Sequence, residues 1–296
     1  MVDGPRHRQH LTDAALTVTD HQRTSLVTGA NTGIGLVTAR ELARRGDRVI
    51  VACRSAAKAA DAIAEIVDAT GNADVEHLAL DLADLDAVRA AATELLERGE
   101  PIDVLVANAG LAGQRGQTAQ GFELAFGTNH LGHFLFVTML LPLVEAAPAP
   151  SRIVVVASDS HEQADGIPWD DLQRPTRSIT GLPEYAVSKL ANVLFAQELA
   201  RRLPDEVFVG SLHPGVIASD VWRRIPWPVR PLMKRFMKST EEGAETSLLL
   251  ATSDEVLAHR GAFWSEGKLK DPNPVATPEL AAELWRRSEE WVAELG

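Results

Sequence analysis

The sequence predicts an α/β fold in which a doubly wound parallel sheet carries helices on both faces. Short apolar runs alternate with amphipathic segments of helical period along most of the 296 residues, a pattern typical of parallel sheets. The first run is followed by three glycines and then by a helical segment, a context typical of nucleotide binding. The runs expected as strands are 25–27, 48–52, 75–80, 102–107, 152–157 and 207–212.

The segments between these runs have apolar residues at helical spacing. The expected helices are 34–43, 56–69, 85–96, one or two helices over 118–144 that end around Pro142 and Pro148, and 183–203. No break of composition divides the series, so 24–296 is expected to form one domain. It follows a tail or short lead-in helix over 1–23. A proline-interrupted, basic and apolar stretch at about 216–240 is expected to be a substrate loop or lid.

Composition excludes several classes of protein. The net charge of −12 would repel a phosphate backbone, so nucleic acid is not an expected partner. The one cysteine, Cys53, indicates a reducing, cytoplasmic location. No apolar segment approaches the length of a membrane span, and the polar first 23 residues lack a signal-peptide core. The nine histidines show no zinc-binding spacing, so no metal site is expected.

The glycine-rich turn has the form T-G-x-x-x-G-x-G. It leaves backbone N–H groups free at a helix N-terminus, where the helix dipole favours an anion. A Cβ there would block both the tight turn and the approach of a pyrophosphate. The expected cofactor contacts of this turn are Thr28, Gly29, Asn31, Thr32, Gly33, Ile34 and Gly35.

Tyr185, the only tyrosine, and Lys189 lie four residues apart at the start of a long helix and therefore on one face. A nearby ammonium lowers the pKa of a phenol. Bringing that pKa from about 10 to about 7 takes roughly 4 kcal/mol, more than one lysine supplies alone. An oxidised nicotinamide would add to it. Without other residues, this pair is better explained by a packed ring beside a solvated lysine.

Polar residues at the strand ends give the pair a context. Ser158 ends the fifth run, where its hydroxyl would face the ligand crevice and hydrogen-bond a carbonyl or alcohol oxygen. Asn108 to Gly110 end the fourth run, and Asn129 lies on the next helix with an amide that can hold a water or a backbone group in line with Lys189. Together these residues form a proton-relay arrangement.

These motifs resemble the short-chain dehydrogenase/reductase family over about 24–264. The resemblance rests on TGANTGIG at 28–35, NAG at 108–110, Asn129, Ser158, YAVSK at 185–189, and Pro214-Gly215. It implies a single Rossmann domain with a sheet of about seven strands. It also implies an oxidoreductase that uses a CH–OH donor and a nicotinamide acceptor.

The resemblance also implies a role for each matching residue. Ser158 polarises the carbonyl, Tyr185 is the acid in reduction and the base in oxidation, and Lys189 holds the nicotinamide ribose and lowers the pKa of Tyr185. Asn129 completes the relay. Further cofactor contacts are expected at Asn108, Ala109, Gly110, Pro214, Gly215, Ile217 and Ser219. Ser219 stands where the family usually has threonine and keeps the hydroxyl.

Within the family, 129–134 and 185–195 are similar to the retinol-dehydrogenase-like branch. The chain shows no segment like the membrane anchor common among the animal retinol enzymes, so a soluble, bacterial-type member is expected. Members of the family often pair through the helices that carry Asn129 and Tyr185, which leaves a homodimer open.

The cofactor preference depends on the end of the second strand. An acidic residue there would bind the ribose of NAD, whereas an arginine suits the 2′-phosphate of NADP. The sequence has Arg54 and no acid, which favours NADP over NAD. Asp81 and Leu82 are expected to contact the adenine ring.

The sequence therefore predicts an NADP-dependent oxidoreductase for a bulky apolar ketone, aldehyde or alcohol. Apolar loops bearing Trp169, Trp222 and Trp227 motivate the substrate class. A lipid aldehyde, a steroid, a polyketide ketone of secondary metabolism and a retinol-like substrate all remain open. The alternative is an NADP-binding sensor without turnover. A serine hydrolase is set aside because there is no G-x-S-x-G elbow.

Overall fold

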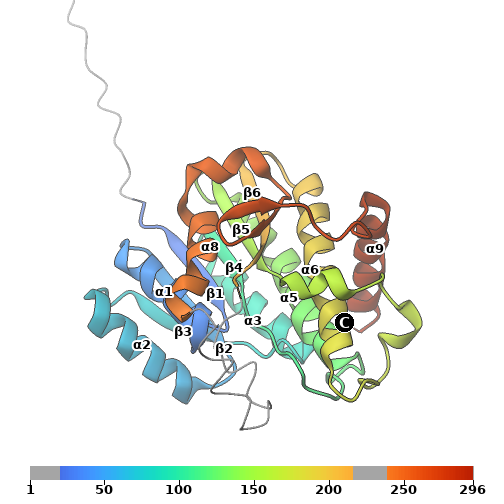
Figure 1. Ribbon diagram of the computed structural model, residues 1–296. Helices are drawn as coiled ribbons and strands as arrows, with labels where there is room; N and C mark the ends of the chain where they lie inside the picture. Colours follow the sequence, from blue (N-terminus) through green and yellow to red (C-terminus); the bar gives the residue numbers. More distant parts are fainter. Residues whose placement is uncertain (1–20, 216–238, 296) are drawn as a thin grey trace, which may run out of the picture.

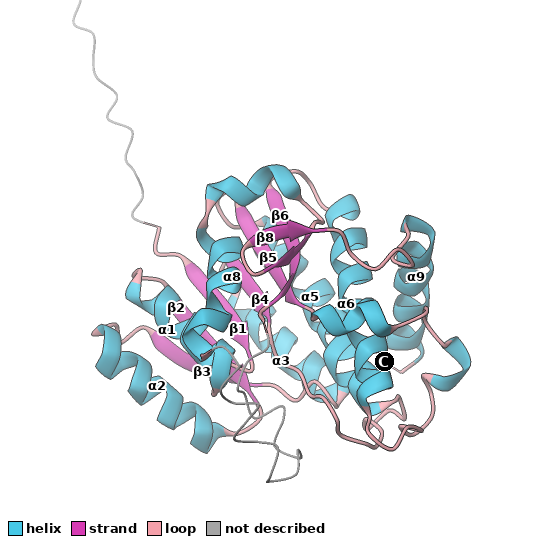
Figure 2. Ribbon diagram, viewed as in Figure 1, coloured by secondary structure: helices cyan, strands magenta, loops and turns pink. Residues whose placement is uncertain are grey.

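The computed structural model describes residues 21–215 and 239–295, whose strands form one eight-stranded sheet (Figures 1 and 2). The order across the sheet is β3-β2-β1-β4-β5-β6-β7-β8. The strands are β1 (Thr24–Thr28), β2 (Arg48–Cys53), β3 (Val75–Ala79), β4 (Val104–Ala107), β5 (Ser151–Val156), β6 (Val207–His213), β7 (Phe263–Ser265) and β8 (Lys268–Lys270). The first six correspond to the six predicted runs and pair in parallel, and two further strands extend the sheet: β7, parallel to β6, and the antiparallel edge strand β8.

Helices cover both faces of the sheet (Figure 2). One face packs against α1 (Gly33–Arg44), α2 (Ala56–Thr70) and α8 (Thr240–Thr252). The other packs against α3 (Leu85–Arg98), α5 (Gly132–Glu145), α6 (Leu182–Arg202) and α9 (Pro278–Glu294). The remaining helical pieces are α4 (Leu124–Phe126), the π-helical turn η1 (Gly127–Leu131), and the 3₁₀ turns η2 (Asp159–Gln163), η3 (Trp169–Asp171) and η5 (Asp254–His259).

The strand order reverses at β1, which lies between β2 and β4. Val27 of β1 pairs in register with Val106 of β4. The chain leaving β1 and the chain leaving β4 therefore emerge side by side at the carboxyl edge of the sheet. In open α/β sheets this is the switch point at which ligands bind.

The segment predicted as one or two helices over 118–144 begins later than expected, at Leu124, and ends at Glu145, close to the expected end. It runs without interruption from α4 through η1 to the end of α5, and Pro142 lies inside α5. Proline removes one backbone hydrogen bond, but Leu140, Leu143 and Val144 around it are buried in the core, and this packing offsets the loss.

The same helix corrects the expectation about membrane-length segments. By length and composition, 124–145 is apolar enough to cross a membrane, and it is the one such helix among the described residues. Most of it is buried between other elements of the protein, as in the core helix of a globular domain. The expected lid lies almost wholly in 216–238, outside the described residues, and the single-domain organisation of 24–296 stays a prediction.

Candidate active site

The turn between β1 and α1 forms a cradle that only glycine fits. Gly29 has φ of +67°, and a Cβ there would lie 2.9 Å from the Cα of Ala109. A Cβ on Gly35 would lie 2.5 Å from Nδ2 of Asn108 and 2.6 Å from the carbonyl oxygen of Gly29. Thr32 begins α1 without a side-chain cap, so N–H groups of the first turn remain available to an anion.

Thr28 joins this cradle to the end of β4. Its hydroxyl accepts hydrogen bonds from the backbone N–H groups of Asn108 and Ala109, both at 2.9 Å. The side-chain amide of Asn108 donates to the carbonyl oxygen of Thr28 at 2.8 Å. The two motifs that the sequence placed at neighbouring strand ends are therefore bonded to each other.

Asn129 lies in the π-helical turn and is fully buried. Its amide holds a backbone group, as expected: Oδ1 accepts from the N–H of Leu111 at 2.9 Å, and Nδ2 donates to the carbonyl oxygen of Leu111 at 3.0 Å. Nδ2 also donates to Oγ of Ser188 at 2.9 Å. A Cβ added to Gly110 would lie 3.3 Å from Oδ1 of Asn129 and 3.5 Å from Nζ of Lys189, so Gly110 separates the two.

Ser158 lies two residues beyond β5, in a loop rather than in the strand itself. Its hydroxyl accepts from the N–H of Ser160 at 3.1 Å and caps the short helix η2. It lies close enough to the side chain of Tyr185 to lower the pKa of that phenol. The structure thus brings the serine and the tyrosine of the expected relay together.

Lys189 is buried one turn along α6 from the partly exposed Tyr185. Nζ of Lys189 lies 5.7 Å from the centroid of the Tyr185 ring and donates to the carbonyl oxygen of Val156 at 2.8 Å. Asn192 donates to the same oxygen at 3.1 Å. The lysine is anchored to the end of β5, close to Ser158.

Burial dominates the protonation of both relay groups. It lowers the pKa of Lys189 to about 7 and raises the pKa of Tyr185, against the opposite effect of the nearby Ser158 hydroxyl. The expected lowering of the Tyr185 pKa by Lys189 stays a prediction for the protein with its cofactor bound.

Comparisons with known proteins agree with this geometry. A family model described as short chain dehydrogenase matches residues 23–168. Human retinol dehydrogenase 14 is 41% identical over 299 residues, which cover 93% of this chain and 88% of that protein. The chain belongs to the short-chain dehydrogenase/reductase family. Its similarity to the retinol dehydrogenases supports the retinol-dehydrogenase-like branch.

Two solved structures extend the comparison. An uncharacterized protein from Mycobacterium Paratuberculosis superposes with a TM-score of 0.74 at 33% identity, covering 92% of this chain and 94% of that one. A short chain dehydrogenase from Escherichia coli CFT073, complexed with NADPH, has a TM-score of 0.67 at 22% identity and covers 83% and 97%. The second likeness is one of fold. Short-chain dehydrogenases bind a nicotinamide cofactor, and the glycine cradle fits one.

Arg54 lies just beyond β2 and is 73% exposed. Its guanidinium is 3.8 Å from the carboxylate of Asp81, a weak ion pair at that exposure, so the side chain is available to a phosphate. Asp81 and Leu82 lie in the loop after β3, which ends at Ala79 rather than reaching them. The carbonyl oxygen of Leu82 would lie 2.3 Å from a Cβ on Gly132, so this loop packs directly on α5.

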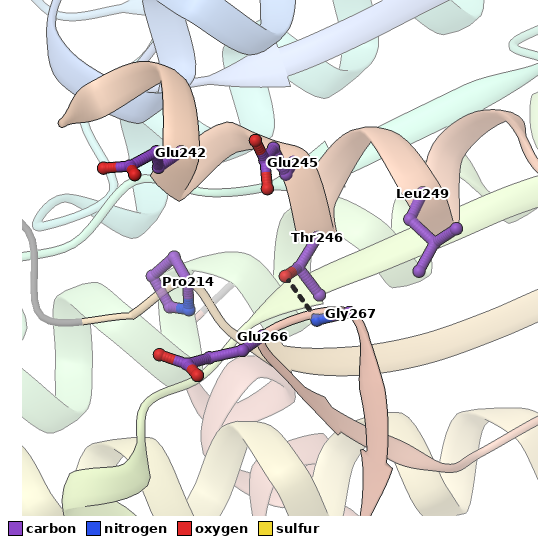
Figure 3. Close-up of a pocket in the computed structure, with 7 residues that line it drawn as sticks. All are labelled: Pro214, Glu242, Glu245, Thr246, Leu249, Glu266 and Gly267. Atoms are coloured by element: carbon purple, nitrogen blue, oxygen red, sulfur yellow. Dashed lines mark hydrogen bonds between the residues drawn. The ribbon is translucent and has the colours of Figure 1, made fainter. Parts of the chain in front are cut away.

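Pro214 and Gly215 follow β6, whereas Ile217 and Ser219 lie outside the described residues. Pro214 borders a cavity of about 250 Å³ between α8 and the β7–β8 turn (Figure 3). Its other lining residues are Glu242, Glu245, Thr246, Leu249, Glu266 and Gly267. The three glutamates make it a poor match for an apolar ketone or for a phosphate.

Trp169 packs against the C-terminal helix. Its ring packs against Trp291 of α9 at 6.4 Å between centroids, and the guanidinium of Arg287 lies 4.6 Å above it. The contact holds the loop after η2 to the C-terminal helix. Trp169 therefore gives no support to a bulky apolar substrate, and Trp222 and Trp227 lie outside the described residues.

Two buried histidines that no sequence motif indicated lie next to residues of the relay and the cradle. Nδ1 of His161 lies 2.7 Å from the carbonyl oxygen of Ser158, and Nε2 of His161 accepts a hydrogen bond from the backbone N–H of Asn273 at 3.0 Å. His133 is buried and contacts the hydroxyl of Thr28. The available signal was a histidine within four residues of a motif residue, Ser158 for His161 and Asn129 for His133.

Proposed function

We propose that this short-chain dehydrogenase is an NADP-dependent oxidoreductase acting on a bulky apolar ketone, aldehyde or alcohol. The observation that carries the proposal is the meeting of Ser158 and Tyr185 beside the buried Lys189, at the same sheet edge as the glycine cradle. The nicotinamide, when bound, supplies the hydride in reduction and accepts it in oxidation.

The protein's own residues handle the oxygen and the proton. In reduction, the Ser158 hydroxyl donates to the carbonyl oxygen and Tyr185 transfers its phenolic proton to that oxygen. In oxidation the phenolate accepts the proton of the alcohol. Burial raises the pKa of Tyr185 and so keeps the phenol protonated at neutral pH, which is the form that reduction requires.

Lys189 is suited to hold the cofactor and to pass on the proton. Protonated, its amine carries three N–H donors, and the carbonyl oxygen of Val156 takes one of them. The others are available to ribose hydroxyls. Its pKa of about 7 allows it to give and take a proton near neutral pH.

Arg54 supports the preference for NADP. It is the basic residue at the end of β2 where an NAD enzyme carries an acid, and its exposed guanidinium can form charge-assisted hydrogen bonds with a 2′-phosphate. The substrate class is supported by the relatives named retinol dehydrogenases, whose names indicate an apolar alcohol.

The test begins with titration of NADPH and NADH by fluorescence, followed by NADPH consumption over a panel of apolar ketones and aldehydes that includes retinaldehyde. We expect tighter binding of NADPH and turnover of at least one substrate. Tyr185→Phe, which keeps the ring and removes the proton, should lower kcat by about 10²–10⁴. Full turnover by this variant would refute the relay, and tight NADPH binding with no turnover would favour the sensor.

A further inference from the structure

His133 lies in the first turn of α5 and bridges two motifs of the candidate site. It is 1% exposed. Its Nδ1 lies 3.0 Å from the carbonyl oxygen of Asn129, and its Nε2 lies 2.9 Å from Oγ1 of Thr28. One imidazole therefore connects the turn that carries the relay asparagine with the start of the glycine cradle.

The partners fix the tautomer of this imidazole. A carbonyl oxygen only accepts, so Nδ1 carries the proton and Nε2 of the neutral ring is an acceptor. The Thr28 hydroxyl must then donate to Nε2, because the alternative acceptor, the carbonyl oxygen of Val106, is 3.5 Å away. Both lone pairs of the hydroxyl oxygen remain for the N–H groups of Asn108 and Ala109.

The environment of His133 favours this neutral form. Burial lowers its pKa to about 4, and the positive charge of nearby Lys189 acts in the same direction. The hydrogen bond to Asn129 opposes them. A protonated ring would present a second N–H to Thr28, whose oxygen already accepts two hydrogen bonds.

We propose that His133 is a positioning residue for the cofactor site. His133 accepts a hydrogen bond from the Thr28 hydroxyl and thereby orients the lone pairs of that oxygen toward the N–H groups of Asn108 and Ala109. These bonds hold the end of β4 against the glycine cradle. By donating to the Asn129 backbone, His133 couples the cradle to the relay. The inference rests on the proposed function, because it assigns His133 to the binding of the same dinucleotide.

The first test compares His133→Phe with His130→Phe. His130 is a matched control: it is also 1% exposed, lies three residues earlier in the same continuous helix, and bonds Ser288 of α9 instead of the cradle. We expect His133→Phe to weaken NADPH binding about tenfold, the effect of one buried hydrogen bond, and His130→Phe to leave it within twofold. Equal effects in both variants would overturn the proposal.

A double-mutant cycle separates positioning from packing. Thr28→Val removes the hydroxyl with little change of shape, and we expect Thr28→Ser to recover most of the lost affinity. If His133 acts through that hydroxyl, adding His133→Phe to Thr28→Val costs little further affinity. Additive losses in NADPH affinity would show that His133 contributes only packing and would overturn the proposal.

A measurement on the unaltered protein covers the case in which the variants fail to fold. The ¹⁵N shifts of the His133 ring at pH 7 should show a protonated Nδ1 and an unprotonated, hydrogen-bonded Nε2. The opposite tautomer would overturn the proposal. If the unaltered protein binds no nicotinamide dinucleotide, the proposed function fails as well, whereas normal binding by every folded His133 variant refutes this inference alone.

Discussion

Adding one methyl group at Gly35 tests whether the cradle between β1 and α1 depends on close backbone contact. Gly35 lies within α1 and its backbone suits any residue. The obstacle is space: the new Cβ would lie 2.5 Å from Nδ2 of Asn108 and 2.6 Å from the carbonyl oxygen of Gly29. Both atoms belong to the cradle and its support, so the substitution displaces the site itself.

The net effect of Gly35→Ala follows from three opposing contributions. Helix propensity favours alanine over glycine by about 1 kcal/mol. Overpacking costs about 2 kcal/mol, and displacing the Asn108 amide gives up its hydrogen bond to Thr28, worth about 1 kcal/mol. We therefore expect the free energy of unfolding to fall by about 2 kcal/mol, and NADPH binding to weaken tenfold or more as the cradle shifts.

Urea unfolding and fluorescence titration of NADPH measure the two effects separately. Gly46→Ala is the control, because Gly46 has φ of +94° and no atom within 4 Å of an added Cβ, at the far end of α1. Backbone strain should cost this variant about 1 kcal/mol of stability without altering NADPH affinity. Wild-type NADPH affinity in Gly35→Ala would refute the reasoning.

Three further predictions concern the charge, the pH dependence and the support of the site. Arg54→Ala should weaken NADPH binding about tenfold and NADH binding less than twofold in the same titration, since its ion pair with Asp81 is weak; equal losses would remove Arg54 from the phosphate site. The cofactor-free protein should gain stability as the pH rises from about 7 toward 10.5, because unfolded Lys189, at its ordinary pKa of 10.5, binds a proton that the native side chain has released. Urea unfolding at pH 7 and pH 9 should show a smaller gain for Lys189→Met, and an equal gain would contradict the assignment. Asn273→Ala deletes an amide that donates to the carbonyl oxygens of His161 at 3.0 Å and Ala164 at 2.8 Å; loosening the Ser158 loop should lower kcat about tenfold with a much smaller change in NADPH affinity, and an unchanged kcat in the folded variant would argue against that support.

Most of the sheet could be predicted because its strands are continuous apolar runs. The interior strands are buried on both faces, so β5, with its β-branched centre, is recognisable without alternation. β7 and β8 were not predicted, since strands of three residues are too short to show a period. Pro142 misled the helix prediction because a local breaking signal is weaker than packing that involves residues distant in sequence.

The candidate site was predictable to the extent that strand ends determine it. Asn108 directly follows β4, and its contact with Thr28 follows from the order of the strands. The support of Ser158 did not follow, because it comes from Asn273, more than a hundred residues later. Such a hydrogen bond depends on the path of the chain after β8, and no local sequence pattern predicts that path.

Lys189 shows why spacing alone does not fix the chemistry of a relay. The spacing of four places its amine near the ring of Tyr185. Desolvation, which spacing does not reveal, favours the neutral form of each group: it lowers the pKa of Lys189 and raises the pKa of Tyr185. An apolar substrate entering first would exclude more water and extend both shifts. The positive charge of an oxidised cofactor would lower the pKa of Tyr185, and ribose hydroxyls that accept hydrogen bonds from the Lys189 amine would raise the pKa of Lys189. Under the proposed function, the phenol therefore titrates closest to neutral pH in the protein that has already bound its oxidised cofactor.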